Sequence, residues 1–376
     1  MSAEPQRSLH TRERTESPLV RVWHSSGARL ESLSTRWAIG AFVVAGILMT
    51  VVMYGSRWPL AGSNQSVGNI AAWITSALAG LSFATAYVVE ARRGYDPWRR
   101  RLPMVKRVLD VVATSVAMGM LSYLGVLAVA SLFQLGFHGL TIDPLGGGAL
   151  AGAAAATFTY VAVLAGSRVT GEGLSILATL VLFIGTISSM LSTPDQSWWQ
   201  WHFSELGNNH AASAFRFNLA LILTGLVITV LANYVGHDIE LGLRARNVPK
   251  RRRTRLVRLF SWLYAGIGIF MSVAGVVTDG MSFPFHVAAA TSMTVTVGVI
   301  VFFALRYLPE LPRDITVFSL LMLAGTAVAV LLWVPLHYYN LTGMEFIAAG
   351  LLFAWLTVFV RAIAAYARPA APAESL

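Results

Sequence analysis

The chain has 376 residues, of which 56% are hydrophobic and only 12% are charged, and its mean hydropathy is +0.63. Soluble domains carry roughly 25% charged residues, so this composition excludes a soluble globular protein and predicts an integral membrane protein. The net charge of +10 does not indicate nucleic-acid binding, because the cations cluster between apolar segments, where they orient the chain and meet anionic headgroups. The sequence contains no cysteine, which excludes disulfides and thiolate metal sites.

The N-terminal region, residues 1–36, is polar and rich in arginine, and we expect a cytoplasmic tail whose first part is disordered. Within it, residues 19–36 mix apolar side chains with arginines. This pattern fits an amphipathic helix on the inner membrane surface and also fits a solvated segment. The tail lacks a short apolar core followed by small residues, so we expect the first span to act as an uncleaved insertion signal.

Ten apolar runs follow, each close to the roughly 20 residues that cross a hydrocarbon core of about 30 Å. The predicted spans are residues 37–55, 68–90, 109–136, 148–166, 172–192, 214–236, 259–278, 285–306, 315–336 and 344–366. Loops 91–108 and 237–258 are densely basic, whereas Arg57 is the one Lys or Arg in the alternate connections. Because positive residues stay on the cytoplasmic side, the sequence predicts an all-α polytopic membrane protein with both termini cytoplasmic. Its arginine-rich, lysine-poor composition suggests a bacterial cytoplasmic membrane.

Small residues also predict how some helices pack. Gly148, Gly152 and Ala156 recur every four residues, and Gly268 and Gly275 lie seven apart, so both runs allow helices to approach closely. Contacts within one chain are the simpler interpretation, and a dimer contact is the alternative. We divide the chain into a tail, a four-helix unit, a six-helix unit and a second cytoplasmic tail: residues 1–36, 37–170, 171–366 and 367–376.

The connection between the fifth and sixth spans stands out because it is polar, aromatic and acidic, whereas the segments on either side of it are apolar. Functional residues gather on such loops, and His, Asp and Glu near a membrane boundary can act as general acids and bases. We expect the binding residues to lie there and at the outer ends of neighbouring spans, with no catalytic residue assigned and no cofactor. The candidates are Trp198, Trp199, Trp201, His202, Ser204, Glu205, Asn209, His210, Arg216, Asn218, Asp279, His286 and His337.

The spacing of these candidates leaves several chemistries open. His202, Glu205 and His210 form H-x-x-E-x-x-x-x-H, which matches no helical zinc motif, so we predict no metal site. Ser204 is either a nucleophile or a helix cap, and the absence of G-x-S-x-G favours the cap. Arg216 needs a partner at the membrane boundary, for which we expect Glu205, Asp279 or a lipid phosphate.

The three tryptophans of this loop, Trp198, Trp199 and Trp201, are expected to form an aromatic belt at the membrane interface. An aromatic wall for a sugar or headgroup is the alternative. The chain contains no P-loop, so we do not expect it to hydrolyse ATP itself.

One stretch, WWQWHFSELGNNHAASAFRFNLALILTG, combines an F-S-E-L-G turn with a span that opens F-N-x-x-L-x-x-x-G. It resembles an uncharacterised bacterial membrane family that is grouped with the FRAG, DRAM and Sfk membrane proteins. The resemblance covers about residues 172–366, includes His286 and the segment Leu341–Phe346, and leaves the first four spans uncovered. It implies six helices and a link to membrane-lipid handling, without established catalytic residues.

We therefore consider three functions. The first is transport, flipping or regulation of a lipid or lipid-linked glycan at the outer leaflet, with the headgroup bound by Arg216, Glu205, Asn209 and His210. The second is a membrane-embedded lipid hydrolase or transferase. The third is an accessory subunit of a cell-envelope complex. Anionic headgroups at the basic cytoplasmic loops, and an envelope protein, are the expected partners.

Overall fold

The computed structural model describes residues 18–93, 98–208 and 211–368. In this part of the chain, ten helices are long and apolar enough to cross a membrane. They are α1 (Pro18–Val52), α2 (Val67–Arg93), α3 (Met104–Gly136), α4 (Pro144–Ser167), α5 (Gly171–Met190), α6 (Ala212–Ala245), α7 (Lys250–Val276), α8 (Asp279–Tyr307), α9 (Arg313–Trp333) and α10 (Leu341–Tyr366). Each overlaps one predicted span, so the all-α polytopic fold is confirmed.

Several helices extend beyond the apolar runs that predicted them. Helices α6 and α7 continue into the basic loop 237–258 and leave only a short turn between them, and α1 begins at Pro18, inside the predicted tail. Residues 18–36 are thus continuous with the first span and do not form a separate surface helix. The physical reason is that hydropathy locates the hydrocarbon core, whereas backbone hydrogen bonding continues into the headgroup region.

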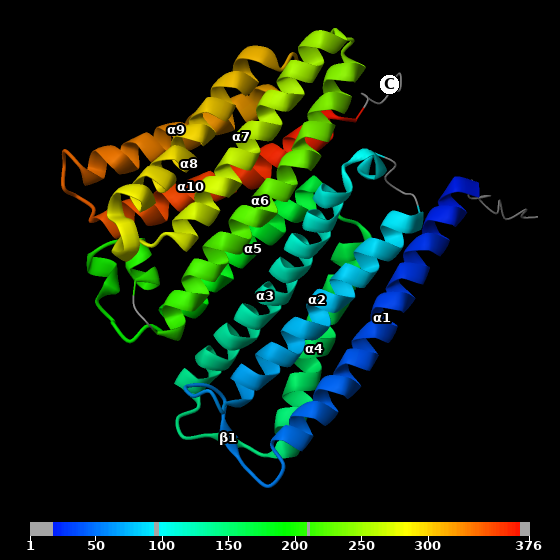
Figure 1. The fold of residues 1–376 in the computed structure, drawn as a ribbon, viewed down its shortest axis with the longest axis vertical. Helices are drawn as coiled ribbons and strands as arrows, with labels where there is room; N and C mark the ends of the chain where they lie inside the picture. The colour runs from blue at the N-terminus through cyan, green and yellow to red at the C-terminus, as the bar shows by residue number, and fades with distance from the viewer. Residues whose placement is uncertain (1–17, 94–97, 209–210, 369–376) are drawn as a thin grey trace, which may run out of the picture.

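The helices form two groups that lie side by side (Figure 1). Helix α4 packs on α1 and α2, and α2 packs on α3; in the second group α6 packs on α5 and α7, α7 on α8, and α10 on α5 and α9. Helix α3 joins the groups through contacts with α5 and α6, where Leu124 and Leu231 are fully buried. The division of the chain into a four-helix and a six-helix unit stays a prediction.

The predicted small-residue contacts lie within the chain. A Cβ at Gly148 would stand 2.8 Å from the carbonyl oxygen of Gly46 in α1, and one at Gly268 would stand 2.3 Å from that of Gly225 in α6. These glycines therefore let α4 approach α1 and α7 approach α6.

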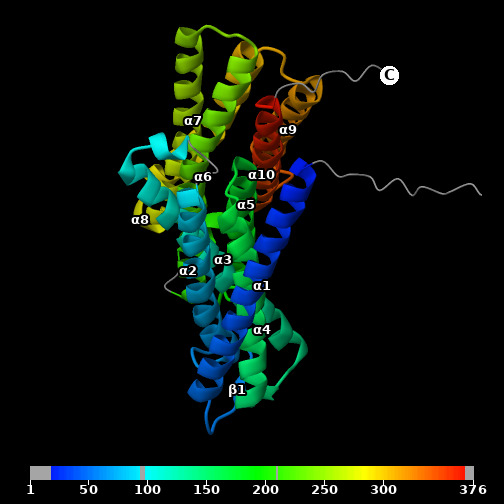
Figure 2. The same cartoon turned by 90° about the vertical axis from the view of Figure 1, so that its right-hand side faces the viewer.

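The described chain starts and ends at the same end of the helix bundle (Figure 2). There the 3₁₀ helix η1 (Arg99–Arg101) joins α2 to α3. At the opposite end, strand β1 (Trp58–Pro59) pairs antiparallel with β2 (Thr141–Ile142). This opposite end, which we call the loop end, also carries the 3₁₀ helices η2 (Trp198–Gln200) and η3 (Phe203–Gly207) and the N-termini of α6, α8 and α10.

Candidate functional site

The connection between α5 and α6 folds against the loop end through an apolar anchor. Leu206 is fully buried, Trp198 is only 7% exposed, and both pack on Phe217 of α6. The Trp198 ring fills the space beneath η3 and is shielded from lipid, and its place in an interfacial belt stays a prediction. Trp199 and Trp201 are 53% and 65% exposed and remain available for the interface.

A close contact between Gly207 and Asn218 fixes η3 on α6. The Asn218 side-chain amide donates to the Gly207 carbonyl over 2.9 Å. A Cβ at position 207 would lie 2.3 Å from Asn218 Oδ1, so a side chain larger than hydrogen does not fit. Asn218, a predicted binding residue, thus holds the F-S-E-L-G turn in place.

Two further elements hold the connection from the sides. The Phe203 backbone N–H donates to Glu345 Oε2 of α10 over 2.6 Å. Asn208 bridges to α8, because its amide donates to Glu205 Oε2 over 2.9 Å and its Oδ1 accepts from the Gly280 N–H over 3.1 Å. The segment is therefore clamped between α6, α8 and α10.

Helix α8 is bent where it enters the site. Ser282 has non-helical backbone angles, and Pro284 cannot donate a hydrogen bond within the helix. Beyond this bend, the side chain of His286 is buried, and its Nε2 lies 2.7 Å from the hydroxyl oxygen of Ser204. Its Nδ1 lies 2.9 Å from the carbonyl oxygen of Val277.

These two contacts determine the direction of both hydrogen bonds. A carbonyl oxygen only accepts, so the hydrogen of the neutral imidazole of His286 must reside on Nδ1. Nε2 is then an acceptor, and the Ser204 hydroxyl donates to it. A hydroxyl that donates to an oriented imidazole is the arrangement that activates a serine nucleophile.

A group of carboxylates lies beside this pair. His202 Nε2 is 3.0 Å from Asp279 Oδ2 and 3.9 Å from Glu205 Oε2. Glu345 is close enough to His202, His286 and Asp279 to interact with them electrostatically. We call His202, Glu205 and Asp279 the His-Glu-Asp cluster. Their ligand atoms all lie within 4.8 Å of one another.

Arg216 does not join this group. Its guanidinium donates to the Ser188 carbonyl over 3.4 Å and hydrogen-bonds the side chain of Tyr123, so it points between α3, α5 and α6. The expected pairing with Glu205 or Asp279 is therefore not formed. Burial between helices explains the difference, since a polar group within the bundle finds partners on neighbouring helices.

The remaining predicted residues lie apart from this cluster or beyond the described chain. His337 is exposed in the turn after α9, with a backbone φ of 49°. Asn209 and His210 fall outside the described residues. Sequence reasoning missed Asn208 and Glu345 as site residues. Glu345 did carry a signal, because a carboxylate one turn inside an apolar span is costly unless it has a specific partner.

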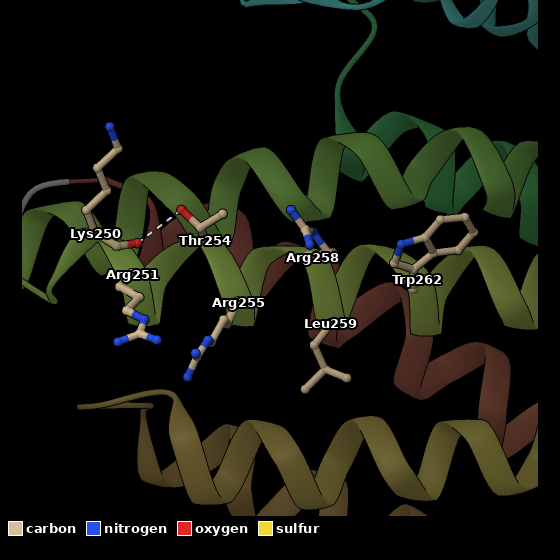
Figure 3. Close-up of a pocket in the computed structure, with 7 residues that line it drawn as sticks. All are labelled: Lys250, Arg251, Thr254, Arg255, Arg258, Leu259 and Trp262. Carbon is tan, nitrogen blue, oxygen red and sulfur yellow. Dashed lines mark hydrogen bonds between the residues drawn. The ribbon is translucent and has the colours of Figure 1, made fainter.

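A surface groove lies at the other end of the bundle. It is a groove of about 790 Å³ along the first turns of α7, and four cations spread along it with Trp262 at its far end (Figure 3). Its lining residues are Lys250, Arg251, Thr254, Arg255, Arg258, Leu259 and Trp262. We call this surface the basic groove.

The fold defines a multi-pass membrane protein. Residues 176–362, from α5 to α10, match the model of a family described as a protein of unknown function (DUF998). This confirms that the six-helix unit resembles an uncharacterised family; its grouping with FRAG, DRAM and Sfk proteins and its bacterial origin stay predictions. No curated protein and no solved structure matches the chain.

Proposed function

We propose that this protein is a membrane-embedded hydrolase or transferase that acts on a lipid ester at the loop end, with Ser204 as nucleophile and His286 as its base. The observation that carries the proposal is the 2.7 Å contact between Ser204 Oγ and His286 Nε2, with Nδ1 held by the Val277 carbonyl. Sequence had favoured a capping role for Ser204, but its hydroxyl meets an imidazole from another helix.

The chemistry balances with these two side chains. Ser204 Oγ attacks the acyl carbon or phosphorus of the ester while its proton passes to His286 Nε2. His286 then protonates the departing alcohol, and an acyl or phosphoryl serine remains. Water or a second alcohol, deprotonated by His286, attacks this intermediate and restores Ser204. Water gives hydrolysis, and an alcohol gives transfer.

The surroundings of the site favour a lipid as substrate. The bend of α8 exposes Met281 (72%), Phe283 (60%) and Phe285 (70%), and Phe346 of α10 is 61% exposed nearby. On a spanning helix such side chains suit contact with acyl chains or the interfacial zone. A lipid could therefore reach Ser204 from the side. That the site faces the outer leaflet follows from the topology expected from the basic loops.

Transport or flipping of a lipid without chemistry, which the sequence had placed first, assigned the headgroup to Arg216 together with Glu205, Asn209 and His210. Arg216 instead points between helices and donates to the Ser188 carbonyl. The hydrolase or transferase therefore has the stronger support, and lipid handling without chemistry becomes an outcome of the test.

The test measures the reactivity of Ser204 without knowledge of the substrate. The full chain, purified in detergent, is treated with a fluorophosphonate probe whose phosphorus accepts an activated serine oxygen and releases fluoride. We expect labelling at Ser204, located by peptide mass spectrometry, and at least a hundredfold slower labelling in His286→Gln, because general-base catalysis contributes roughly 10²–10⁴-fold. Ser197→Ala is the matched control, since Ser197 lies in the same connection and hydrogen-bonds Asp195.

Lipid analysis then identifies the reaction. In cells that lack the gene, complementation with the wild type but not with Ser204→Ala should clear an accumulated ester precursor. A protein that resists the probe, or a Ser204→Ala variant that clears the lipid as well as the wild type, would exclude the serine mechanism. Lipid that is mislocalised but chemically finished would indicate handling without chemistry.

The basic groove has a separate role in this proposal: it binds anionic headgroups at the opposite membrane surface. Grooves of this kind, with cations between or beside spanning helices, bind phosphate headgroups through charge. Arg251→Gln combined with Arg255→Gln should reduce co-purified anionic lipid, and Arg57→Gln, at the loop end, should not. If the wild type, the double variant and Arg57→Gln co-purify with equal anionic lipid, the groove does not bind headgroups. The basic surface would then be a docking site for an envelope protein.

A further inference from the structure

Within the described residues, no Lys or Arg forms a salt bridge with the carboxylates of the His-Glu-Asp cluster or with Glu345. Three carboxylates, those of Glu205, Asp279 and Glu345, converge with two histidines, and Arg216 is directed elsewhere. Like charges that are partly removed from water repel strongly, and such groups persist when they are paired or coordinate a cation. The N-termini of α8 and α10 offset only part of this charge, since each supplies roughly half an elementary charge.

Asp279 gives an independent observation that points to a ligand. Its side chain is only 8% exposed, and Oδ2 faces His202 Nε2 at 3.0 Å. Within the described part of the chain, the other oxygen, Oδ1, is buried without a hydrogen-bond partner. A buried carboxylate oxygen without a hydrogen-bond donor destabilises the folded protein. We therefore expect a bound cation or donor next to this oxygen.

From these observations we infer that His202, Glu205 and Asp279 bind one divalent metal ion, Zn²⁺ or Mn²⁺. Ligand atoms around a tetrahedral zinc ion stand about 3.3 Å apart, since the metal–ligand distances are about 2.0–2.1 Å. The contacts of His202 Nε2, 3.0 Å to Asp279 and 3.9 Å to Glu205, bracket that separation. One imidazole with two carboxylates suits Zn²⁺ or Mn²⁺ better than a soft ion, which prefers sulfur.

The surroundings provide the other requirements of a metal site. Asn208 holds Glu205 by a hydrogen bond and is itself fixed by the Gly280 N–H, so it orients a ligand from outside the coordination sphere. Glu205 and His202 are 34% and 21% exposed, which leaves an entry path and an open position. If Ser204 acts as proposed above, the ion would stabilise the oxyanion of the attacked ester.

The experiment measures metal binding and needs no activity. The full chain in detergent is stripped with a chelator and titrated with Zn²⁺, Mn²⁺ and Mg²⁺, and bound metal is counted by equilibrium dialysis and elemental mass spectrometry. We expect one equivalent of Zn²⁺ or Mn²⁺ and a higher Tm with metal. Asp279→Asn and His202→Gln should weaken binding by far more than tenfold, and Asn208→Ala by about 10–100-fold.

Matched controls separate binding from folding. Asp195→Asn removes an exposed carboxylate of the same connection and His138→Gln an exposed histidine of the same end, so both should bind metal like the wild type. Without metal, Asp279→Asn should remain folded with a Tm close to the wild type, because the isosteric amide can still contact His202 while one carboxylate of the cluster is neutralised. Wild-type protein that takes up neither ion, or Asp279→Asn that binds as tightly as the wild type, would overturn the inference.

The two proposals fail separately. Ser204→Ala should keep its metal, because Ser204 is not a ligand. Metal uptake without probe labelling would support the metal site and contradict the serine mechanism. Probe labelling without metal uptake would support the serine mechanism and contradict the metal site.

Discussion

The contact between Gly207 and Asn218 provides a quantitative test of how the site is assembled. In Gly207→Ala the new methyl would stand 2.3 Å from Asn218 Oδ1 and 3.1 Å from Phe217 Cδ1, so η3 must shift away from α6. Overpacking of this kind costs about 1–3 kcal/mol. Asn218→Ala removes the donor to the Gly207 carbonyl and should cost about 1 kcal/mol.

The double variant Gly207→Ala with Asn218→Ala distinguishes a direct steric clash between the two positions from independent destabilisation at each. Removing the Asn218 amide also removes the atom that the new methyl meets, whereas the contact with Phe217 remains. We therefore expect Gly207→Ala with Asn218→Ala to be less destabilised than the sum of the single variants, by about 1–2 kcal/mol. Denaturant titration of the protein in detergent gives these free energies of unfolding.

A control and a refuting result complete this test. Gly350 lies within α10 with nothing within 4 Å of its Cβ position, so Gly350→Ala should be neutral or stabilise by up to about 1 kcal/mol. If the effects of Gly207→Ala and Asn218→Ala add to within about 0.5 kcal/mol, the two positions are not coupled and the geometry given for η3 is wrong.

Three further results are expected. Glu345→Ala should lower the free energy of unfolding by about 1–3 kcal/mol. Glu345→Gln should lower it by less, because the amide oxygen can still accept the hydrogen bond from the Phe203 N–H. Equal losses of the two variants in denaturant titration would contradict this. Gly268→Ala should destabilise the protein by at least about 1–3 kcal/mol through the crossing of α6 and α7, while Gly298→Ala, with open space at its Cβ, should not; equal Tm values would refute the close crossing. Arg216→Met should lower Tm without changing probe labelling of Ser204. Loss of labelling in a folded Arg216→Met variant would show that Arg216 takes part in the site.

Sequence alone was enough for the architecture of the membrane part. Hydropathy is a property of consecutive residues, so each apolar run could be assigned to a span without knowledge of its neighbours. The same local contrast identified the connection between α5 and α6 as unusual. Helix ends were less predictable, as α1 and α7 show, because helical hydrogen bonding continues beyond the apolar residues.

The site itself depends on contacts that no local pattern encodes. Ser204 and His286 are 82 residues apart, and Phe203 and Glu345 are 142 apart. Whether such residues meet is decided by which helices are neighbours, by their rotation about their own axes and by the bend of α8. In the same way, H-x-x-E-x-x-x-x-H gives no sign that His202 and Glu205 lie beside Asp279 of another helix. Arg216 was misplaced for the same reason, since its direction depends on the packing of α6 against α3 and α5. The sequence by itself therefore determined which residues enter the membrane and which connection is polar, while only the tertiary structure decided which polar side chains meet.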